Sequence, residues 1–307
     1  MKRVLVTGGS GWIGRHVTAR LLEKGFEVHA TYRRAVISNS NTSATCHWHQ
    51  VDLLDEAAVT SLIHNVQPTY LIHLAWEAVP PQCYRSITNY HWVHASMALI
   101  QRFVENGGTD VVIAGSCAEY EWENGYLAEQ STPLSNKTPY ALCKNTLRTW
   151  LQSYAEHVGL RVCWARIFHL YGPHESGKRF ISSIITSLLK KEEVLCTHGR
   201  QSRDFLYIED VAAALVSLAM SKLDGVVNIG SGRPVPLRLI ASIIQEQMGS
   251  RASIHWGAIP LPADEPLFVG ANIERLTKEA HWKPAYTLHA GLIETIAWWR
   301  HQVEEQC

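Results

Sequence analysis

The N-terminal segment combines a short apolar run with a glycine-rich turn. Val4–Val6 is followed directly by Thr7 and then Gly-Gly-Ser-Gly-Trp-Ile-Gly, whose glycines satisfy both GxxGxxG and GxGxxG spacing. The residues from Ile13 to Lys24 repeat apolar side chains with the period of a helix. Small residues at such a turn let backbone N–H groups and the helix dipole approach a pyrophosphate. The segment predicts a strand, a turn and a helix that bind a dinucleotide, and the residues expected at the cofactor are Gly8, Gly11, Trp12, Ile13 and Gly14.

Short apolar runs continue to alternate with helical periods along the first half of the chain. Expected strands lie at 27–31, 48–51, 70–74, 111–114 and 162–168, and expected helices at 56–65, 89–105 and 140–157. Strands that alternate with helices imply a parallel sheet covered on both faces. The pattern therefore predicts an α/β fold with a Rossmann-type doubly wound parallel sheet.

The second half of the chain is less regular. Helical periods lie at 180–189, 208–220, 237–248 and 288–299, and one more buried strand at 226–229. We expect residues 1–168 to form an NADP-binding Rossmann domain. Residues 169–307 are expected to form a smaller α/β lobe for the substrate, with the strand near 226–229 returning to the sheet.

Composition excludes several classes of protein. The chain has 28 Lys and Arg against 28 Asp and Glu, a net charge of zero that argues against a nucleic-acid partner. No apolar run approaches the roughly 20 residues that span a bilayer, and the first apolar stretch is too short for a signal peptide. The seven cysteines show no CxxC spacing, which favours free thiols in a cytoplasmic protein. The histidines lack partners at zinc-site spacing, so we expect no metal site.

The end of the second strand bears on the choice of cofactor. An NAD site usually has an acidic residue there for the ribose hydroxyls. The sequence has Arg33 and Arg34 instead, and two guanidinium groups suit a 2′-phosphate. This favours NADP(H) over NAD, while a solvated loop remains the alternative for the two arginines.

A second motif carries acid–base chemistry. Tyr140 and Lys144 are four residues apart and so share one face of a helix, and Ser116 follows the strand at 111–114. A tyrosine has a reference pKa near ~10, and a neighbouring ammonium favours its phenolate. The serine hydroxyl can hydrogen-bond the reacting oxygen. We expect Ser116, Tyr140 and Lys144 to be the catalytic residues.

Together with the glycine turn, this set resembles the extended short-chain dehydrogenase/reductase family, in its nucleotide-sugar epimerase/dehydratase branch. The resemblance covers nearly the whole chain and includes Thr7–Gly14, Val51–Leu53, His73–Ala75, Asn89, Ser116, Tyr140, Lys144, Arg166–Pro173 and Arg203–Val211. It implies that Asp52 and Leu53 contact adenine, that Leu74 and Ala75 line the cofactor channel, and that Lys144 also holds the nicotinamide ribose. It further implies a homodimer formed through a four-helix bundle.

The resemblance also implies a nucleotide-diphosphate sugar as substrate. Arg203 matches the family arginine that grips the diphosphate, and a fixed cation suits that group. Arg179 is a second phosphate candidate, and Glu265 lies where the family often places a nucleotide contact. His169 stands where the family commonly has asparagine, and is expected to face the substrate or nicotinamide pocket; a buried packing role is the alternative.

Departures from the family patterns narrow the reaction. The family's 4,6-dehydratases have Asp-Glu after the hydroxyl residue, whereas Cys117 and Ala118 stand here, which disfavours dehydration. The epimerase-reductases have a cysteine two residues after the serine and a histidine after Tyr-Gly-Pro. The position of the cysteine is occupied by Ala118, so only the histidine of that pattern is present, as His174. His174 is therefore a candidate substrate contact, and a loop residue without a role in binding is the alternative. A histidine like His169 occurs in chains similar to the CDP-abequose/paratose synthases, which reduce a 4-keto sugar with NADPH.

We therefore expect an NADPH-dependent reductase of the C4 ketone of a nucleotide-linked 4-keto-6-deoxy sugar. An NAD-retaining nucleotide-sugar 4-epimerase with the same catalytic residues is the first alternative. A non-enzymatic NADP-sensing protein is the second, although a sensor has no need for an acid–base pair. A reductase of small aromatic ketones is also conceivable, but would leave the Arg203 region without a diphosphate partner.

Overall fold

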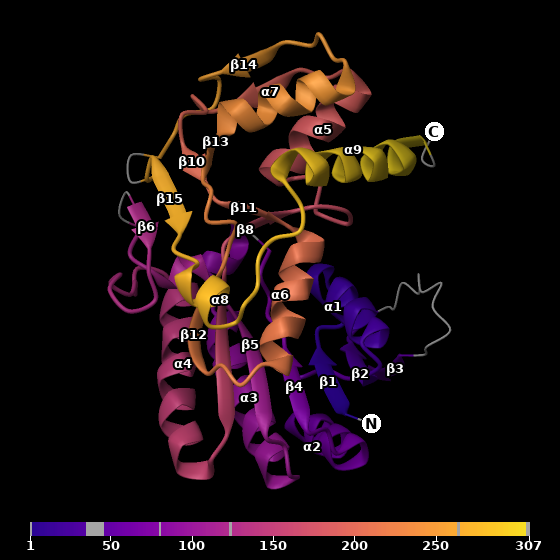
Figure 1. The fold of residues 1–307 in the computed structure, drawn as a ribbon, viewed down its shortest axis with the longest axis vertical. Coiled ribbons are helices and arrows are strands. Elements are labelled where there is room, and N and C mark those ends of the chain that lie inside the picture. The colour runs from indigo at the N-terminus through magenta and orange to yellow at the C-terminus, as the bar shows by residue number, and fades with distance from the viewer. Residues whose placement is uncertain (1, 35–45, 80, 123–124, 263–264, 305–307) are drawn as a thin grey trace.

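A parallel sheet of seven strands forms the lower half of the molecule in Figure 1. The computed structural model describes residues 2–34, 46–79, 81–122, 125–262 and 265–304. Its strand order is β12-β7-β5-β4-β1-β2-β3, and all neighbouring strands pair in parallel. The strands are β1 (Arg3–Thr7), β2 (Glu27–Tyr32), β3 (His47–Gln50), β4 (Tyr70–His73), β5 (Asp110–Ser116), β7 (Arg161–Ile167) and β12 (Gly225–Ile229). The order reverses between β1 and β4, as in a doubly wound sheet, so the predicted fold class is confirmed.

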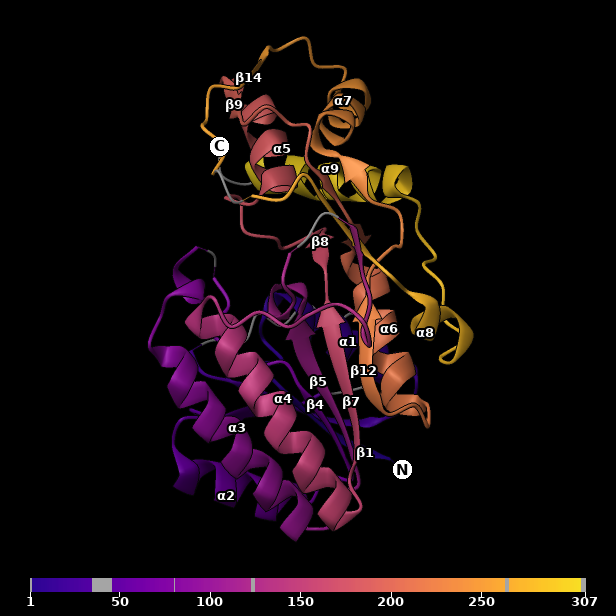
Figure 2. The same ribbon diagram turned by 90° about the vertical axis from the view of Figure 1, so that its left-hand side faces the viewer.

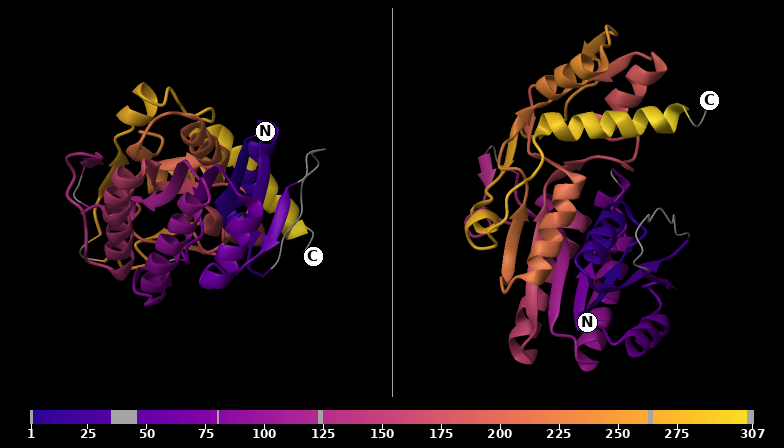
Figure 3. Two further views of the ribbon diagram at one scale, coloured as in Figure 1. Left: turned by 90° about the horizontal axis from the view of Figure 1, so that it is seen from below. Right: turned by 45° about the vertical axis from the view of Figure 1, so that its right-hand side comes forward.

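Helices cover both faces of this sheet, as Figures 2 and 3 show. One face packs against α1 (Trp12–Glu23) and α6 (Ile208–Met220), and the other against α2 (Glu56–Val66), α3 (Thr88–Glu105) and α4 (Pro139–Val158). The alternation of side chains along β1 explains the two layers: Val4 and Val6 join one apolar cluster, and Leu5 joins the other. Because both faces are buried at the centre of the sheet, β1, β4 and β5 consist mainly of buried apolar residues.

Most of the second half of the chain, apart from α6 and β12, lies above the carboxyl ends of the strands (Figure 1). Its helices there are α5 (Phe180–Lys190), α7 (Leu237–Met248) and α9 (Leu288–Glu304), while α8 (Glu274–Lys278) packs beside β12. Its strands form two pairs, β8 (His169–Tyr171) with β11 (Phe205–Tyr207) and β9 (Val194–Cys196) with β14 (Ile254–Trp256). A four-stranded sheet joins β13 (Val235–Pro236), β10 (Ser202–Arg203), β15 (Phe268–Ala271) and β6 (Gly125–Leu127). These elements therefore lie over the carboxyl ends of the strands of the large sheet.

Two global features of the described residues bear on earlier expectations. No helix among them is long and apolar enough to cross a membrane. The cysteines they contain are all free thiols, and most of these are buried.

Candidate active site

The glycine turn between β1 and α1 forms a cradle in which side chains would clash. A Cβ on Gly14 would lie 2.1 Å from the carbonyl oxygen of Gly8, and a Cβ on Gly9 would lie 2.7 Å from the Cβ of Ala30. Gly8 has φ +68°, a left-handed conformation that favours glycine. The chain therefore turns tightly, with its backbone open to a ligand.

The start of α1 is suited to an anion. Its N-cap, Gly11, provides no side-chain hydrogen bond, and the first turn contains no acidic residue. The first N–H groups of a helix without a capping side chain are free to bind a phosphate. These features fit the pyrophosphate of a dinucleotide, which the turn and Trp12 and Ile13 would hold.

The other residues expected at the cofactor lie along the same edge of the sheet. Arg33 and Arg34 are exposed and directly follow β2. The remaining four lie just after the strands on either side of β1 and β2: Asp52 and Leu53 follow β3, and Leu74 and Ala75 follow β4. The α-carbon of Ala75 would lie 3.0 Å from a Cβ on Gly8, so the β4 end lies directly against the turn.

The structure brings Ser116, Tyr140 and Lys144 together at the next strand end. Ser116 ends β5, and Tyr140 and Lys144 lie in the first turns of α4, where the hydroxyl of Thr138 caps the helix by accepting the N–H of Ala141. The Nζ of Lys144 donates to the carbonyl of Ala114 at 2.9 Å. α4 thus starts at the edge where β5 ends, with both reactive side chains directed there.

Burial controls the charge of the tyrosine and the lysine. Burial, and next the charge of Glu119, raise the pKa of Tyr140 well above its usual value, and a hydrogen bond with Ser116 acts in the opposite direction. Burial lowers the pKa of Lys144 to about 7, and Glu119 opposes that shift. Without a ligand, Tyr140 is therefore a neutral phenol, a state able to donate a proton.

Glu119 is a buried carboxylate that the sequence analysis missed. It lies in the 3₁₀ helix Cys117–Glu119, where it accepts the backbone N–H of Ser116 at 2.7 Å and the Nε of Arg166 at 2.7 Å. The indole N–H of Trp164 donates to it at 2.9 Å. Its signal was its place three residues after Ser116, the position of a capping box. Glu119 therefore holds the backbone of Ser116 in place, and the ion pair with Arg166 balances the charge of Glu119.

Two aromatic residues from the segment after β4 enclose Tyr140, and the sequence analysis missed both. The rings of Trp76 and Tyr84 meet that of Tyr140 edge-on, with centroids 6.4 and 5.7 Å away. The Nζ of Lys144 lies 3.8 Å from the centroid of the Trp76 ring. Trp76 follows His-Leu-Ala at the end of β4, where residues are expected to line the cofactor channel. This position was the only feature of the sequence that could have pointed to Trp76.

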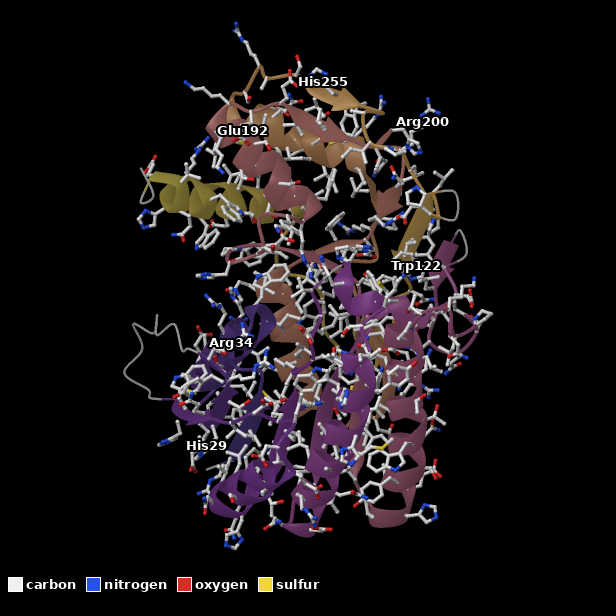
Figure 4. The ribbon with its side chains drawn as sticks, turned by 180° about the vertical axis from the view of Figure 1, so that it is seen from behind. His29, Arg34, Trp122, Glu192, Arg200 and His255 are labelled. Atoms are coloured by element: carbon white, nitrogen blue, oxygen red, sulfur yellow. The ribbon has the colours of Figure 1, made fainter. Side chains whose placement is uncertain are left out.

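His169 lies in β8 opposite Phe205 of β11. Its ring packs between Phe205 and Trp122, with centroids 5.5 and 6.1 Å away, and its Nδ1 is buried with no hydrogen-bond partner in the described part of the chain. Burial, and next the charges of Arg203 and Arg179, lower its pKa to about 3. His169 is therefore a neutral imidazole with a free polar atom. Figure 4 labels Trp122 beside the junction of the two halves.

Arg203 and Glu265 meet in the upper half. The buried Nη2 of Arg203 donates to the Glu265 carboxylate and, at 2.8 Å, to the carbonyl of Pro266. Arg179 lies over the ring of Trp12 at 5.1 Å, next to the glycine turn. Its charge also influences Tyr84 and His169, which places it between the cofactor edge and the aromatic residues.

His174 is held apart from this group. Its ring contacts are with His16 of α1 and Trp298 of α9, at 6.0 and 4.7 Å between centroids. Burial, and next the charge of Arg15, lower its pKa to about 4. Among the described residues, no group of three or more His, Cys, Asp or Glu side chains is arranged to hold a metal ion.

Comparisons with known proteins agree with this geometry. The model of a family described as "NAD dependent epimerase/dehydratase family" matches residues 4–230. CDP-abequose synthase of Salmonella typhimurium is 27% identical over 95% of this chain and 97% of its own length. UDP-glucuronic acid decarboxylase 1 of Xenopus tropicalis is 27% identical over 99% of this chain and 74% of its own. The structure of UDP-glucose 4-epimerase of Thermus thermophilus in complex with NAD superposes with a TM-score of 0.86, at 25% identity, covering 97% of this chain and 99% of that one.

Proposed function

The chain belongs to the NAD-dependent epimerase/dehydratase family, and we propose that it is an NADPH-dependent reductase of the C4 ketone of a nucleotide-linked 4-keto-6-deoxy sugar. The observation that carries the proposal is the buried set of Ser116, Tyr140 and Lys144, in which burial keeps the Tyr140 phenol protonated. A reduction begins with a proton donor, whereas the oxidation of a hydroxyl begins with a base. The protonated phenol is the form that the reductive direction starts from.

The chain's own residues would divide the work as follows. The dinucleotide would supply the hydride. Tyr140 would donate its phenolic proton to the C4 oxygen, which the Ser116 hydroxyl orients, and the ammonium of Lys144 would stabilise the resulting phenolate. Arg203 would hold the sugar diphosphate by charge-assisted hydrogen bonds. His169 is neutral, and its Nδ1 has no hydrogen-bond partner among the described residues. It would form a hydrogen bond with the sugar.

Loss of water is not part of the proposal. That reaction needs a carboxyl group that faces the sugar and can change its protonation. Glu119, the carboxylate next to the serine, is fully buried and held by Arg166, Trp164 and the Ser116 N–H. It supports the serine rather than the substrate.

The choice of NADP(H) rests on Arg33 and Arg34. Both are exposed at the end of β2, where they would meet a 2′-phosphate. The Thermus relative binds NAD, and this favours a second candidate function, a 4-epimerase that keeps NAD bound and recycles it. The two functions differ in whether the cofactor is consumed.

Activity separates the candidates directly. We expect the purified protein to oxidise NADPH when supplied with nucleotide-linked 4-keto-6-deoxy sugars, and to yield a sugar with a hydroxyl at C4. The proposal would be rejected if NADPH were not consumed while the protein carried tightly bound NAD and inverted C4 of a hydroxyl sugar.

Cofactor preference has its own test. Replacing Arg33 and Arg34 with serine should weaken NADPH binding by roughly 10- to 100-fold, since two charge-assisted contacts are lost, and change NADH binding less than about threefold. Arg251→Ser, at an exposed arginine in the upper half, is the control and should alter neither affinity. Equal losses for NADPH and NADH would contradict the assignment of NADP(H).

A further inference from the structure

The ammonium of Lys144 rests on the face of an indole. Its Nζ lies 3.8 Å from the centroid of Trp76, much closer than the 6.0 Å that separates it from the ring of Tyr140. A cation this close to an indole face is attracted by the ring quadrupole, most strongly where water is excluded. Lys144 is almost fully buried, so this contact acts at near full strength.

Trp76 is itself held in place. Its Nε1 donates to the Oδ1 of Asn89 at 2.8 Å, and the buried amide of Asn89 donates to the carbonyls of Cys83 and Ser86, both at 2.7 Å. These bonds connect the indole to α3 and to the segment that carries Tyr84. The Trp76 ring also stacks near that of Trp92, with ring centroids 6.1 Å apart.

We propose that Trp76 is a positioning residue for proton transfer: its ring face holds the Lys144 ammonium, and its ring packs perpendicular to that of Tyr140 and restricts it. The proposal deepens the proposed function, because it assumes that Tyr140 is the proton donor. Through Asn89, the indole also joins the lysine and the tyrosine to the segment that contributes Tyr84. Trp76 belongs neither to the glycine turn nor to the set of Ser116, Tyr140 and Lys144.

The charged groups around Lys144 leave a role for the indole. Glu119, from the 3₁₀ helix after β5, attracts the ammonium, but its charge is shared with Arg166. His73 of β4 is within electrostatic reach of Lys144, but burial lowers the pKa of His73 to about 3, so it adds no charge near neutral pH. Tyr140 is neutral before the reaction. Besides the charge of Glu119 and the carbonyl of Ala114, the indole is therefore a further attractive contact for a cation that burial disfavours.

The test measures the titration of Lys144 without any substrate. The pH dependence of Lys144 acetylation by acetic anhydride, read by mass spectrometry of its peptide, reports the fraction of free amine. Trp76→Leu removes the ring face and should lower the half-labelling pH by about 0.5 to 1.5 units. Trp76→Phe keeps a ring face and should shift it by less than half as much.

Controls make each outcome decisive. Trp122→Leu changes the other indole of the site, which contacts His169 rather than Lys144, and should leave the half-labelling pH unchanged. Should Trp76→Leu fail to fold by circular dichroism, Trp76→Met fills more of the space and carries the same expectation. An unchanged midpoint in both variants, an equal shift in Trp76→Phe, or an equal shift in Trp122→Leu would overturn the proposal. Because no substrate is used, this measurement can be interpreted even if the protein does not catalyse the proposed reaction.

Discussion

Tyr140 and Lys144 show how burial tunes a pair of residues in opposite directions. Removing water disfavours the charged form of each, so the pKa of the tyrosine rises and that of the lysine falls to about 7. Before ligands bind, the tyrosine is thus neutral and the lysine is about half protonated near pH 7. The negative charges of a dinucleotide and a sugar diphosphate would favour the lysine ammonium, and substrate binding would then complete the acid–base pair.

Removal of the phenol should separate chemistry from binding. Tyr140→Phe keeps the ring against Trp76 and Tyr84 but removes the proton donor, so kcat should fall by about 10²- to 10⁴-fold. Dinucleotide affinity, measured by fluorescence titration, should stay within about threefold of wild type. Tyr126→Phe, at an exposed tyrosine in β6, is the matched control and should keep full activity. A Tyr140→Phe enzyme with normal turnover would exclude Tyr140 as the acid.

The sequence predicted that these candidate residues would lie together, but not their surroundings. Ser116, Tyr140 and Lys144 follow from spacing, because residues four apart on a helix share a face and the serine follows a buried strand. Glu119 has only its capping position relative to Ser116 as a local signal, and Trp76 has no such spacing. The other contacts of both residues join segments far apart in the chain. The bond from Arg166 to Glu119 spans 47 positions and depends on the pairing of β5 with β7.

Among the elements, the turn between β1 and α1 imposes the strictest steric demand. A methyl group at Gly14 would collide with the backbone of both Gly8 and Gly9. Gly14→Ala should therefore displace α1 from the turn and weaken dinucleotide binding by at least about tenfold. Gly125→Ala is the matched control, because a Cβ there meets nothing within 4 Å, and calorimetric titration should find its affinity unchanged. Equal affinities in the two variants would mean that the turn does not cradle the cofactor.

The short strands of the upper half could not be predicted from periodicity. β10 and β13 have two residues each and β8 and β11 three, too few for an alternating pattern to emerge. Their partners also come from distant parts of the chain, as in the pairing of His169 with Phe205. The long strands and helices of the sheet were predicted to within a few residues, because their periods are sustained and their ends carry glycine or proline.

Across the whole molecule, the balanced net charge conceals an uneven distribution. Arg33, Arg34 and Lys144 lie along the carboxyl edge of the sheet, and Arg179 and Arg203 lie in the layer above it. Many of the balancing acids form ion pairs elsewhere, as Glu27 does with Arg3 and Glu56 with Arg102. Zero net charge is therefore compatible with a site for anionic small molecules at this edge of the sheet, where these arginines and Lys144 lie.

Stability should decline in mild acid because histidines are buried in their neutral form. His73 bridges β1 and α3, with Nδ1 2.7 Å from the Thr7 hydroxyl and Nε2 2.9 Å from that of Ser96. Burial lowers its pKa from 6.5 to about 3 in the folded state. Between these two values the unfolded chain binds a proton that the folded chain does not, so this contribution to stability is complete above pH 6.5 and is lost as the pH falls.

The contribution of His73 can be isolated by comparing pH profiles of unfolding. At pH 5 the free energy of unfolding should be lower than at pH 7 by roughly 2 kcal/mol on account of this residue alone. In His73→Asn, which has no titrating group, urea unfolding at the two values should show a dependence on pH smaller by that amount, even though the variant is less stable at pH 7. His64→Asn, at an exposed position of α2, should keep the wild-type dependence. If His73→Asn kept it as well, the acid sensitivity would have to come from other buried groups, of which His169, with a pKa lowered to about 3, is the next to test.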